Sequence, residues 1–179
     1  MRAPVPLRER RADLIFVAFF LVNVGFITYI VDLEQLVIAD AKHFAYPVWP
    51  PPPLVDLVHW YGNNYDPLLI ARPAFWRMTI WIDVLFFGPF YVFAIYAFLR
   101  GRDWIRLPAL VWSGTMCANV LIILMEERSG EWATPHFPLV LALNGPWLLL
   151  PLAVMWRLRR DHPFSRAAEV AAVPATVPA

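Results

Sequence analysis

The chain has 179 residues, a length that fits one domain, and 60% of these residues are hydrophobic while only 16% are charged. Soluble domains usually have about 25% charged residues, so the composition indicates a large surface that does not face water. The formal net charge of +1, without a basic face, argues against a nucleic-acid partner. The single cysteine, Cys117, excludes an intramolecular disulfide.

Four apolar runs follow one another along the chain, at residues 14–31, 78–99, 107–125 and 137–158. Each has about the 20 residues that a helix needs to cross a hydrocarbon core of about 30 Å. The first run follows three arginines, as a signal peptide does, but it is too long for a signal peptide and acidic residues follow it. The sequence therefore predicts an all-α, four-transmembrane-helix bundle at residues 12–160, followed by a disordered C-terminal tail at 161–179.

The basic residues predict the orientation of these helices. They cluster at the start of the chain, between the second and third runs, and after the fourth run, while the other connections are mainly acidic. Because basic loops stay on the cytoplasmic side, we expect both termini to be cytoplasmic and the connection at residues 32–77 to be extracytoplasmic.

This long connection is expected to be partly structured and to pack as a lid over the bundle. A proline-rich stretch at residues 46–54 predicts extended backbone, and residues 55–61 predict a short amphipathic helix that ends with Tyr61 at the membrane interface. Asp66 precedes a proline, a pattern in which the carboxylate commonly caps a turn. We therefore assign Asp66 and Tyr61 a structural role in the lid.

Polar residues lie inside the apolar runs, where a charge costs about 2.5–3.5 kcal/mol on insertion scales. Because neighbouring spans run in opposite directions, the predicted topology places these residues at a similar depth in the outer half of the membrane. This convergence predicts a cavity with a polar floor under the lid. The residues are Asp32, Asp83, Asn119, Asn144 and Trp147.

Each of these residues also has a simpler interpretation. Asp32 could merely reach the membrane interface, and Asn119 and Asn144 are more often interhelical hydrogen-bond partners than ligand contacts. If Asp32 and Asp83 approach each other, they are expected to share a proton and form a hydrogen-bonded pair that captures an amine or protonates an olefin. The histidines have no partners at metal-ligand spacing, so no metal site and no cofactor is predicted.

The order and spacing of many short motifs resemble those of the EXPERA domain family, and within it the sigma-2 receptor-like branch rather than the larger sterol isomerases. The matching positions extend over nearly the whole predicted bundle, from about residue 14 to residue 158. They include Asp32-Leu33, Tyr46-Pro47-Val48, Trp60-Tyr61, Asp66-Pro67-Leu68-Leu69, Pro73-Ala74-Phe75-Trp76, Pro89-Phe90, Trp104-Ile105-Arg106, Pro108-Ala109 and residues 146–151.

The resemblance implies a four-helix bundle whose intramembrane pocket takes sterols or cationic amphiphilic amines, and it implies a homodimer. It implies that Asp32 takes the ligand amine and that Asp83, in place of a glutamate, hydrogen-bonds to Asp32. Three further positions depart from the family pattern: Phe87 replaces a glutamine, Asn119 a threonine and Trp147 a tyrosine. These changes enlarge the apolar share of the pocket. No lysine-based retrieval signal is present at the C-terminus, so a bacterial-type plasma membrane is the expected location.

We therefore predict a multi-pass membrane protein that binds a sterol-like or isoprenoid lipid, accepts cationic amphiphilic amines and contacts membrane lipids. The alternative is a membrane-embedded isomerase or terpene cyclase in which Asp32 and Asp83 are catalytic and move protons at a double bond. Aromatic faces would then stabilise the carbocation. The resemblance implies that an isomerase of the family has a His-x-x-x-Glu pairing in the second span, and the absence of histidine at residues 78–83 therefore favours binding over catalysis. A structural or chaperone-like partner is a third reading, for which the sequence gives no positive signal beyond the lid.

Overall fold

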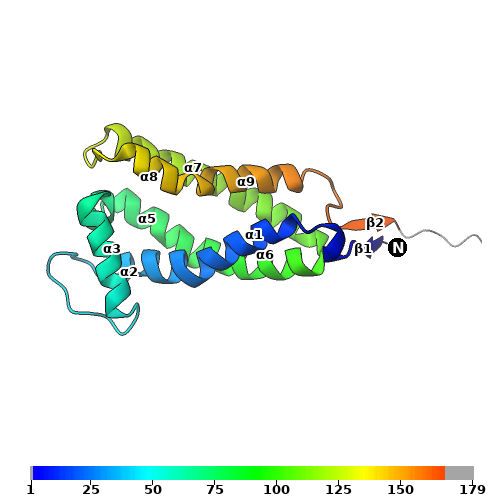
Figure 1. Ribbon diagram of the computed structural model, residues 1–179, viewed down its shortest axis with the longest axis horizontal. Coiled ribbons are helices and arrows are strands. Elements are labelled where there is room, and N and C mark those ends of the chain that lie inside the picture. Colours follow the sequence, from blue (N-terminus) through cyan, green and yellow to red (C-terminus); the bar gives the residue numbers. More distant parts are fainter. Residues whose placement is uncertain (1, 168–179) are drawn as a thin grey trace, which may run out of the picture.

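The computed structural model describes residues 2–167, which form an elongated helical bundle with the terminal strands β1 and β2 together at one end (Figure 1). Four helices are long and apolar enough to cross a membrane: Asp13–Val37, Ala74–Arg100, Asp103–Ser129 and Phe137–Arg157. The predicted number of spans is therefore confirmed.

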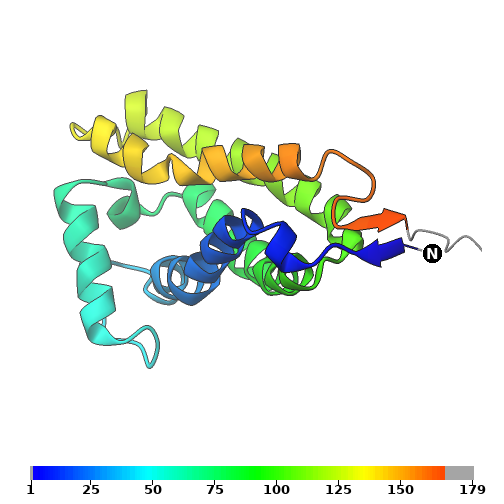
Figure 2. The ribbon, with the colours of Figure 1, turned by 45° about the vertical axis from the view of Figure 1, so that its right-hand side comes forward.

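Each span consists of shorter elements whose ends mark changes in helical geometry. The first contains α1 (Asp13–Val22), the π-helical segment η2 (Asn23–Asp32) and α2 (Leu33–Val37); the second contains α5 (Ala74–Ile82), the π-helical segment η3 (Asp83–Phe87) and α6 (Gly88–Arg100). The third contains the 3₁₀ turn η4 (Asp103–Ile105) and α7 (Arg106–Ser129); the fourth contains α8 (Phe137–Asn144) and α9 (Pro146–Arg157). Within the bundle, α1 packs along α6 and α7 packs along α9 (Figure 2).

Two further helices, here called the loop helices, lie between the first two spans: α3 (Pro52–Asn64) and α4 (Leu68–Ala71). The expectation that the whole proline-rich stretch is extended was wrong at its end, because α3 begins at Pro52. A proline is well tolerated in the first turn of a helix, where its missing N–H group has no intrahelical partner to lose.

The expected disorder of residues 161–179 was also wrong where the structure describes them. Strand β2 (Ser165–Ala167) pairs antiparallel with β1 (Arg2–Pro4), and a 3₁₀ turn, η1 (Leu7–Glu9), follows β1. Backbone hydrogen bonds supply the reason, since each short segment satisfies the other's N–H and C=O groups. Residues 168–179 lie outside the described part of the chain.

An ionic cluster closes the same end of the bundle. Asp13 is buried and lies 2.9 Å from Nη1 of Arg10 and 2.7 Å from Nε of Arg157. Both guanidinium groups also lie over the ring of Phe164, at 5.1 and 4.8 Å from its centroid. Because the carboxylate is paired on both sides, this buried charge is compensated and joins the N-terminal segment, α9 and the segment before β2.

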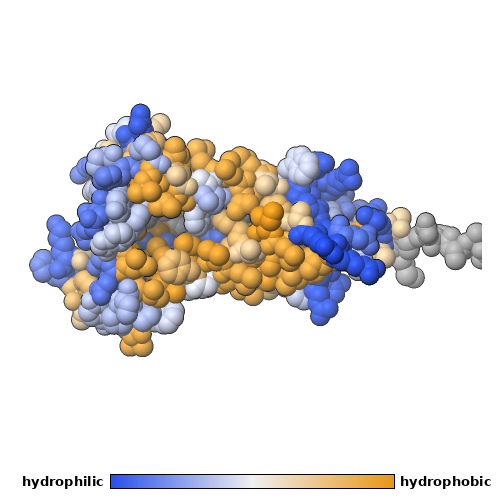
Figure 3. Space-filling view, in the orientation of Figure 1, coloured by the Kyte–Doolittle hydropathy of each residue, from blue (hydrophilic) through white to orange (hydrophobic). Residues whose placement is uncertain are grey.

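The interior and the surface of the bundle have an unusual distribution of apolar side chains. Phe20, Tyr91, Phe98 and Trp112 are almost completely buried and form an aromatic core, in which the rings of Phe20 and Trp112 meet edge to face at 5.5 Å. On the face that Figure 3 shows, exposed apolar residues cover the middle of the molecule, and hydrophilic residues gather at both ends. This pattern matches the lipid-facing surface of a transmembrane bundle.

Candidate intramembrane binding site

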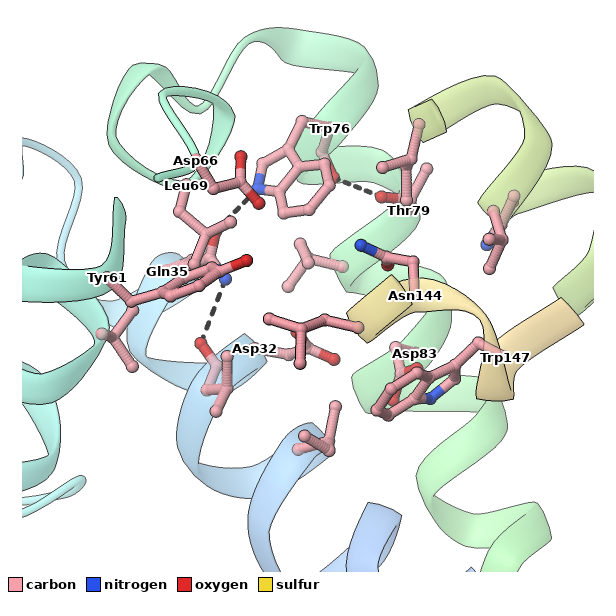
Figure 4. Close-up of a pocket in the computed structure, with 18 of the residues that line it drawn as sticks. Asp32, Gln35, Tyr61, Asp66, Leu69, Trp76, Thr79, Asp83, Asn144 and Trp147 are labelled. Carbon is pink, nitrogen blue, oxygen red and sulfur yellow. Dashed lines mark hydrogen bonds between the residues drawn. The ribbon is translucent and has the colours of Figure 1, made fainter. Parts of the chain in front are cut away.

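A cavity of about 430 Å³ lies between the loop helix α3 and the four spans (Figure 4). Its volume is within the range of about 300–1,000 Å³ that is typical of small-molecule sites, and most of its lining side chains are apolar. All eight residues that the sequence analysis assigned to the site or the lid line this cavity: Asp32, Tyr61, Asp66, Asp83, Phe87, Asn119, Asn144 and Trp147.

The two aspartates of the spans lie further from the helix ends than the hydropathy pattern predicted. The first span continues to Val37 and the second begins at Ala74, so Asp32 is more than one turn and Asp83 more than two turns inside its helix. Both side chains are mostly buried. The carboxylates therefore belong to the interior of the bundle rather than to its rim.

Both aspartates stand at a boundary of π-helical geometry. Asp32 ends η2 and Asp83 begins η3. Pro89, just after η3, has no N–H group to donate to the carbonyl one turn earlier, and a wider turn relieves the resulting clash. π-Helical turns are frequent at functional sites.

Asp83 is held by the neighbouring first span. The hydroxyl group of Thr28, which is fully buried, donates a hydrogen bond to Oδ1 of Asp83. The two spans approach closely here because Gly88 has no side chain: a Cβ at this position would lie 2.6 Å from the hydroxyl oxygen of Tyr29. The sequence analysis missed Thr28, although its position one turn before Asp32 places both residues on one helix face.

Asp32 differs from Asp83 in its partners. It is 8% exposed, it lines the cavity, and it makes no side-chain hydrogen bond or ion pair within residues 2–167. No hydrogen bond joins Asp32 to Asp83 among residues 2–167, and the hydrogen bond that Asp83 accepts comes from Thr28 instead. The carboxylate of Asp32 remains an available acceptor in a largely apolar cavity.

The polar residues of the third and fourth spans have separate roles. Asn144 donates to the carbonyl of Val140 in its own helix at 3.0 Å, and Asn119 makes no side-chain hydrogen bond in the described part of the chain. The interhelical bonds that the simpler interpretation of both asparagines requires are therefore absent from residues 2–167. Trp147 instead forms the interhelical bond, from its indole Nε1 to Oδ1 of Asn23 at 2.8 Å.

A glutamine that the sequence analysis missed also lines the cavity. Nε2 of Gln35 donates to the carbonyl of Val31 at 3.1 Å, and its Oε1 accepts a bond of 2.6 Å from the indole nitrogen of Trp76 (Figure 4). Gln35 follows Asp32 by three positions, a spacing that places both on one face of the helix. That spacing was the available signal in the sequence.

The loop helices supply the opposite side of the cavity. The backbone N–H of Leu68 donates to Oδ1 of Asp66 at 3.2 Å, which is the expected turn cap, and burial raises the pKa of Asp66 to about 6. Burial also raises the pKa of Tyr61 to about 12, with a smaller effect of the nearby Asp66, so Tyr61 keeps its phenolic proton at neutral pH. Besides capping its turn, Asp66 faces the cavity.

A buried ionic cluster attaches the loop helices to the first span. Nη2 of Arg72 lies 2.9 and 2.8 Å from the two carboxylate oxygens of Glu34, and Nε2 of His59 lies 2.8 Å from Oε1 of Glu34. Arg72 also donates to the backbone carbonyls of Leu69 and Ile38. Among residues 2–167, Arg72 is the one non-glycine residue with a positive φ, and its value is 47°. The sequence analysis missed Glu34 and Arg72 because the partners are 38 positions apart.

The fold and the cavity define a class: integral membrane proteins with four transmembrane helices and a small-molecule-sized cavity between them. Residues 53–158, more than half of the chain, match the model of the EBP family, described as EXPERA (EXPanded EBP superfamily). The chain belongs to this family, as its sequence motifs had predicted.

Curated relatives agree with this assignment over most of the chain. The sequence is 29% identical to "Sigma intracellular receptor 2" of Xenopus tropicalis over 157 residues, which cover 82% of this chain and 86% of the relative. It is also 29% identical to the proteins of the same name from Macaca fascicularis, with 84% and 89% coverage, and Homo sapiens, with 84% and 88% coverage. The similarity to these proteins therefore extends beyond the residues that match the family model.

Proposed function

We propose that this protein binds a sterol-like or isoprenoid lipid in the cavity and that it accepts cationic amphiphilic amines through Asp32. The observation that carries the proposal is the carboxylate of Asp32, which faces an apolar cavity without a hydrogen-bond or ion-pair partner among residues 2–167. A buried carboxylate without a partner is unfavourable, and an ammonium group on a ligand would compensate it.

The shape and lining of the cavity support an apolar ligand body. Side chains such as Phe26, Val120 and Leu143 line it, and they offer dispersion contacts but no hydrogen bonds. Phe87 also lines it, at the position where the family resemblance predicts a glutamine, and it lies against the core ring of Trp112 at 6.5 Å. The related proteins are named receptors, which agrees with ligand binding.

The test compares two variants with a lipophilic tertiary amine and a neutral sterol as probes. Asp32→Asn removes the counter-charge and keeps the shape, so amine affinity should fall about 10- to 100-fold. Asp83→Asn should weaken amine binding less, because its amide oxygen still accepts the hydrogen bond of Thr28. Sterol affinity should change little in both variants.

The control is Asp161→Asn, which removes an exposed carboxylate outside the four spans. It should leave both affinities unchanged. If Asp32→Asn binds the amine as tightly as the wild-type protein does, the proposed role of Asp32 is wrong.

A second candidate function is isomerisation or cyclisation of a sterol or isoprenoid olefin. It is favoured by the carboxyl groups of Asp32 and Asp83, which line one cavity with the rings of Trp76 and Trp147. In an isomerisation, one carboxyl group would protonate one olefinic carbon, and a carboxylate would remove a proton from the carbon adjacent to the resulting cation, which moves the double bond without a cofactor. Incubation with an olefinic sterol in deuterated water would then place deuterium in recovered sterol. If the recovered sterol contains no deuterium, the second function is rejected and ligand binding remains as the proposed function.

We further propose cytoplasmic termini, from the distribution of basic residues, and a homodimer, as the family resemblance implies. Chemical cross-linking in native membranes would test the dimer. A product of twice the mass of the chain is expected, and a monomer alone would contradict the proposal.

A further inference from the structure

Glu127, in the last turns of α7, is a buried acid that the proposed function does not use. Its side chain is fully buried and lines the same cavity as Asp32. Within residues 2–167 no N–H or hydroxyl group donates to either of its carboxyl oxygens, and the carboxyl group of Asp66 lies within hydrogen-bonding reach. An unsatisfied buried carboxyl group is costly, and in native structures such a group needs a partner.

The charged groups around Glu127 do not provide that partner. Asp66, from the turn before α4, faces it with a second buried carboxyl group, and one proton shared between the two groups still leaves acceptor oxygens of Glu127 without a donor. Arg72 is occupied by Glu34, and Arg128 lies over the ring of Phe137 at 5.1 Å. In the described part of the chain no arginine, lysine or histidine pairs with Glu127 or Asp66.

A resident metal ion does not account for this pair either. Among residues 2–167 no group of three or more His, Cys, Asp or Glu side chains is arranged to hold one. The phenol of Tyr61 lines the cavity beside the pair and keeps its proton at neutral pH. This part of the cavity therefore has more acceptors than donors.

The position of the pair within the cavity is informative. In Figure 4, Asp66 and Tyr61 lie on one side of the cavity and Asp83 on the opposite side, with Asp32 between them. The lining between these polar groups is largely apolar. A single ligand could thus meet acidic groups at two places along its length.

We infer that Glu127 and Asp66 form a second recognition site in the cavity, which accepts a hydrogen bond from a hydroxyl or amino group at the end of the ligand remote from the group held by Asp32. This inference rests on the proposed function and narrows its ligand class to molecules with an apolar body and a donor at both ends. Lipids with a single polar end, held at Asp32, offer no donor to Glu127.

The test uses three probes with one rigid steroid skeleton and one tertiary amine. They differ only at the remote end, which carries hydrogen, a hydroxyl group or a methoxy group. In the wild-type protein the hydroxyl probe should bind about tenfold more tightly than the hydrogen probe, as a hydrogen bond to a carboxylate would provide. The methoxy probe should gain nothing, because an ether only accepts hydrogen bonds.

Variants of Glu127 test whether this residue causes the tighter binding of the hydroxyl probe. Glu127→Met has a side chain of similar length without strong acceptors, so the three probes should bind equally and as tightly as the hydrogen probe binds the wild type. Glu127→Gln keeps one neutral acceptor and should retain part of the gain. Glu131→Gln removes an exposed charge near the end of α7 and should keep the full gain. Asp32→Asn should weaken all three probes by the same factor.

The outcomes separate this inference from the proposed function. If wild-type protein binds the hydrogen and hydroxyl probes equally, the acids form a self-contained structural pair and the inference is overturned, while the proposed function stands. If wild-type protein binds none of the probes, the proposed function fails first. Should Glu127→Met not accumulate in the membrane, the ratio of hydroxyl to methoxy affinity in wild-type protein and Glu127→Gln decides.

Discussion

The indole Nε1 of Trp147 donates a hydrogen bond of 2.8 Å to Oδ1 of Asn23, a residue 124 positions earlier in the chain. The bond joins α9 to the first span beside the cavity. Asn23 is fully buried, and its amide nitrogen donates to the carbonyl of Phe19 at 2.8 Å. Both polar groups of this asparagine are thus satisfied, and Trp147 holds the fourth span against the first.

Replacement of Trp147 by phenylalanine should destabilise the bundle. The ring is retained in part, but Oδ1 of Asn23 loses its donor, and interhelical bonds in membranes contribute about 0.6 kcal/mol on average and at most about 1.7 kcal/mol. Thermal unfolding in detergent would measure the change. Trp104→Phe is the control, because Trp104 is exposed on the bundle surface. Equal melting temperatures of the two variants would contradict this role.

Thr28→Val should destabilise the protein, because Asp83 then loses its hydrogen-bond donor. The substitution leaves Oδ1 of Asp83 without the hydroxyl group of Thr28, and an unsatisfied buried acceptor costs about 1–3 kcal/mol. We expect a lower melting temperature without ligand. Thr115→Val serves as the control, since the hydroxyl group of Thr115 donates only to its own helix, at the carbonyl of Val111. If Thr115→Val lowers the melting temperature as much as Thr28→Val does, the effect comes from the introduced valine and not from the lost hydrogen bond to Asp83.

Arg72→Lys should release the loop helices from the first span. The guanidinium group serves Glu34 and two backbone carbonyls at once, and a lysine ammonium does not reproduce that planar geometry. Removal of one partner from a buried ion pair costs about 3–5 kcal/mol, and lysine, which keeps the charge, should cost less than Arg72→Met. Limited proteolysis between the first two spans would detect the release. Arg77→Lys, at an exposed position, should remain as resistant as the wild type.

Asp66 should make the stability of the protein depend on pH. Its pKa is raised by burial from 3.8 to about 6, so between these values the folded state binds more protons than the unfolded state. Stability should therefore fall as pH rises through this window and change no further above it. Melting temperatures at about pH 4.5 and about pH 7.5 would show the slope, and Asp66→Asn should flatten it. If the slope persists in that variant, it belongs to another acid, and Glu127 is the neighbour to replace next.

Cysteine labelling would test the proposed orientation. In a Cys117→Ala background, Arg102→Cys should react with a membrane-impermeant reagent from the cytoplasmic side and Glu131→Cys from the other side. Both positions are exposed, whereas a side chain at Gly101 would strain a backbone with φ of 64° and one at Gly130 would clash with Glu126. The reverse labelling pattern would overturn the orientation.

The spans were predictable because length and hydropathy are properties of contiguous segments. The approximate position of the site was predictable too, since alternating directions place polar residues of different spans at one depth. The partners of these residues were not predictable. The bond of Thr28 to Asp83 and the cluster of Glu34 with Arg72 depend on close packing between segments far apart in the chain. Glu127 was read as part of an acidic connection, because the hydropathy pattern ended the third span before it, whereas α7 continues to Ser129.

The π-helical segments η2 and η3 each carry one of the cavity's aspartates at a boundary. A wide turn holds an extra residue compared with an α-helix, so the loss of one residue within η3 would let the segment relax to ordinary helical winding. Because the wide turn absorbs the extra residue, the helix on either side of the deletion would keep the face that it presents to its neighbours. The span would still cross the bilayer, and the change of winding would be confined to the segment that begins at Asp83. In descent, single-residue insertions and deletions at these two points could thus change the backbone around each aspartate while leaving the packing of the spans and membrane insertion intact.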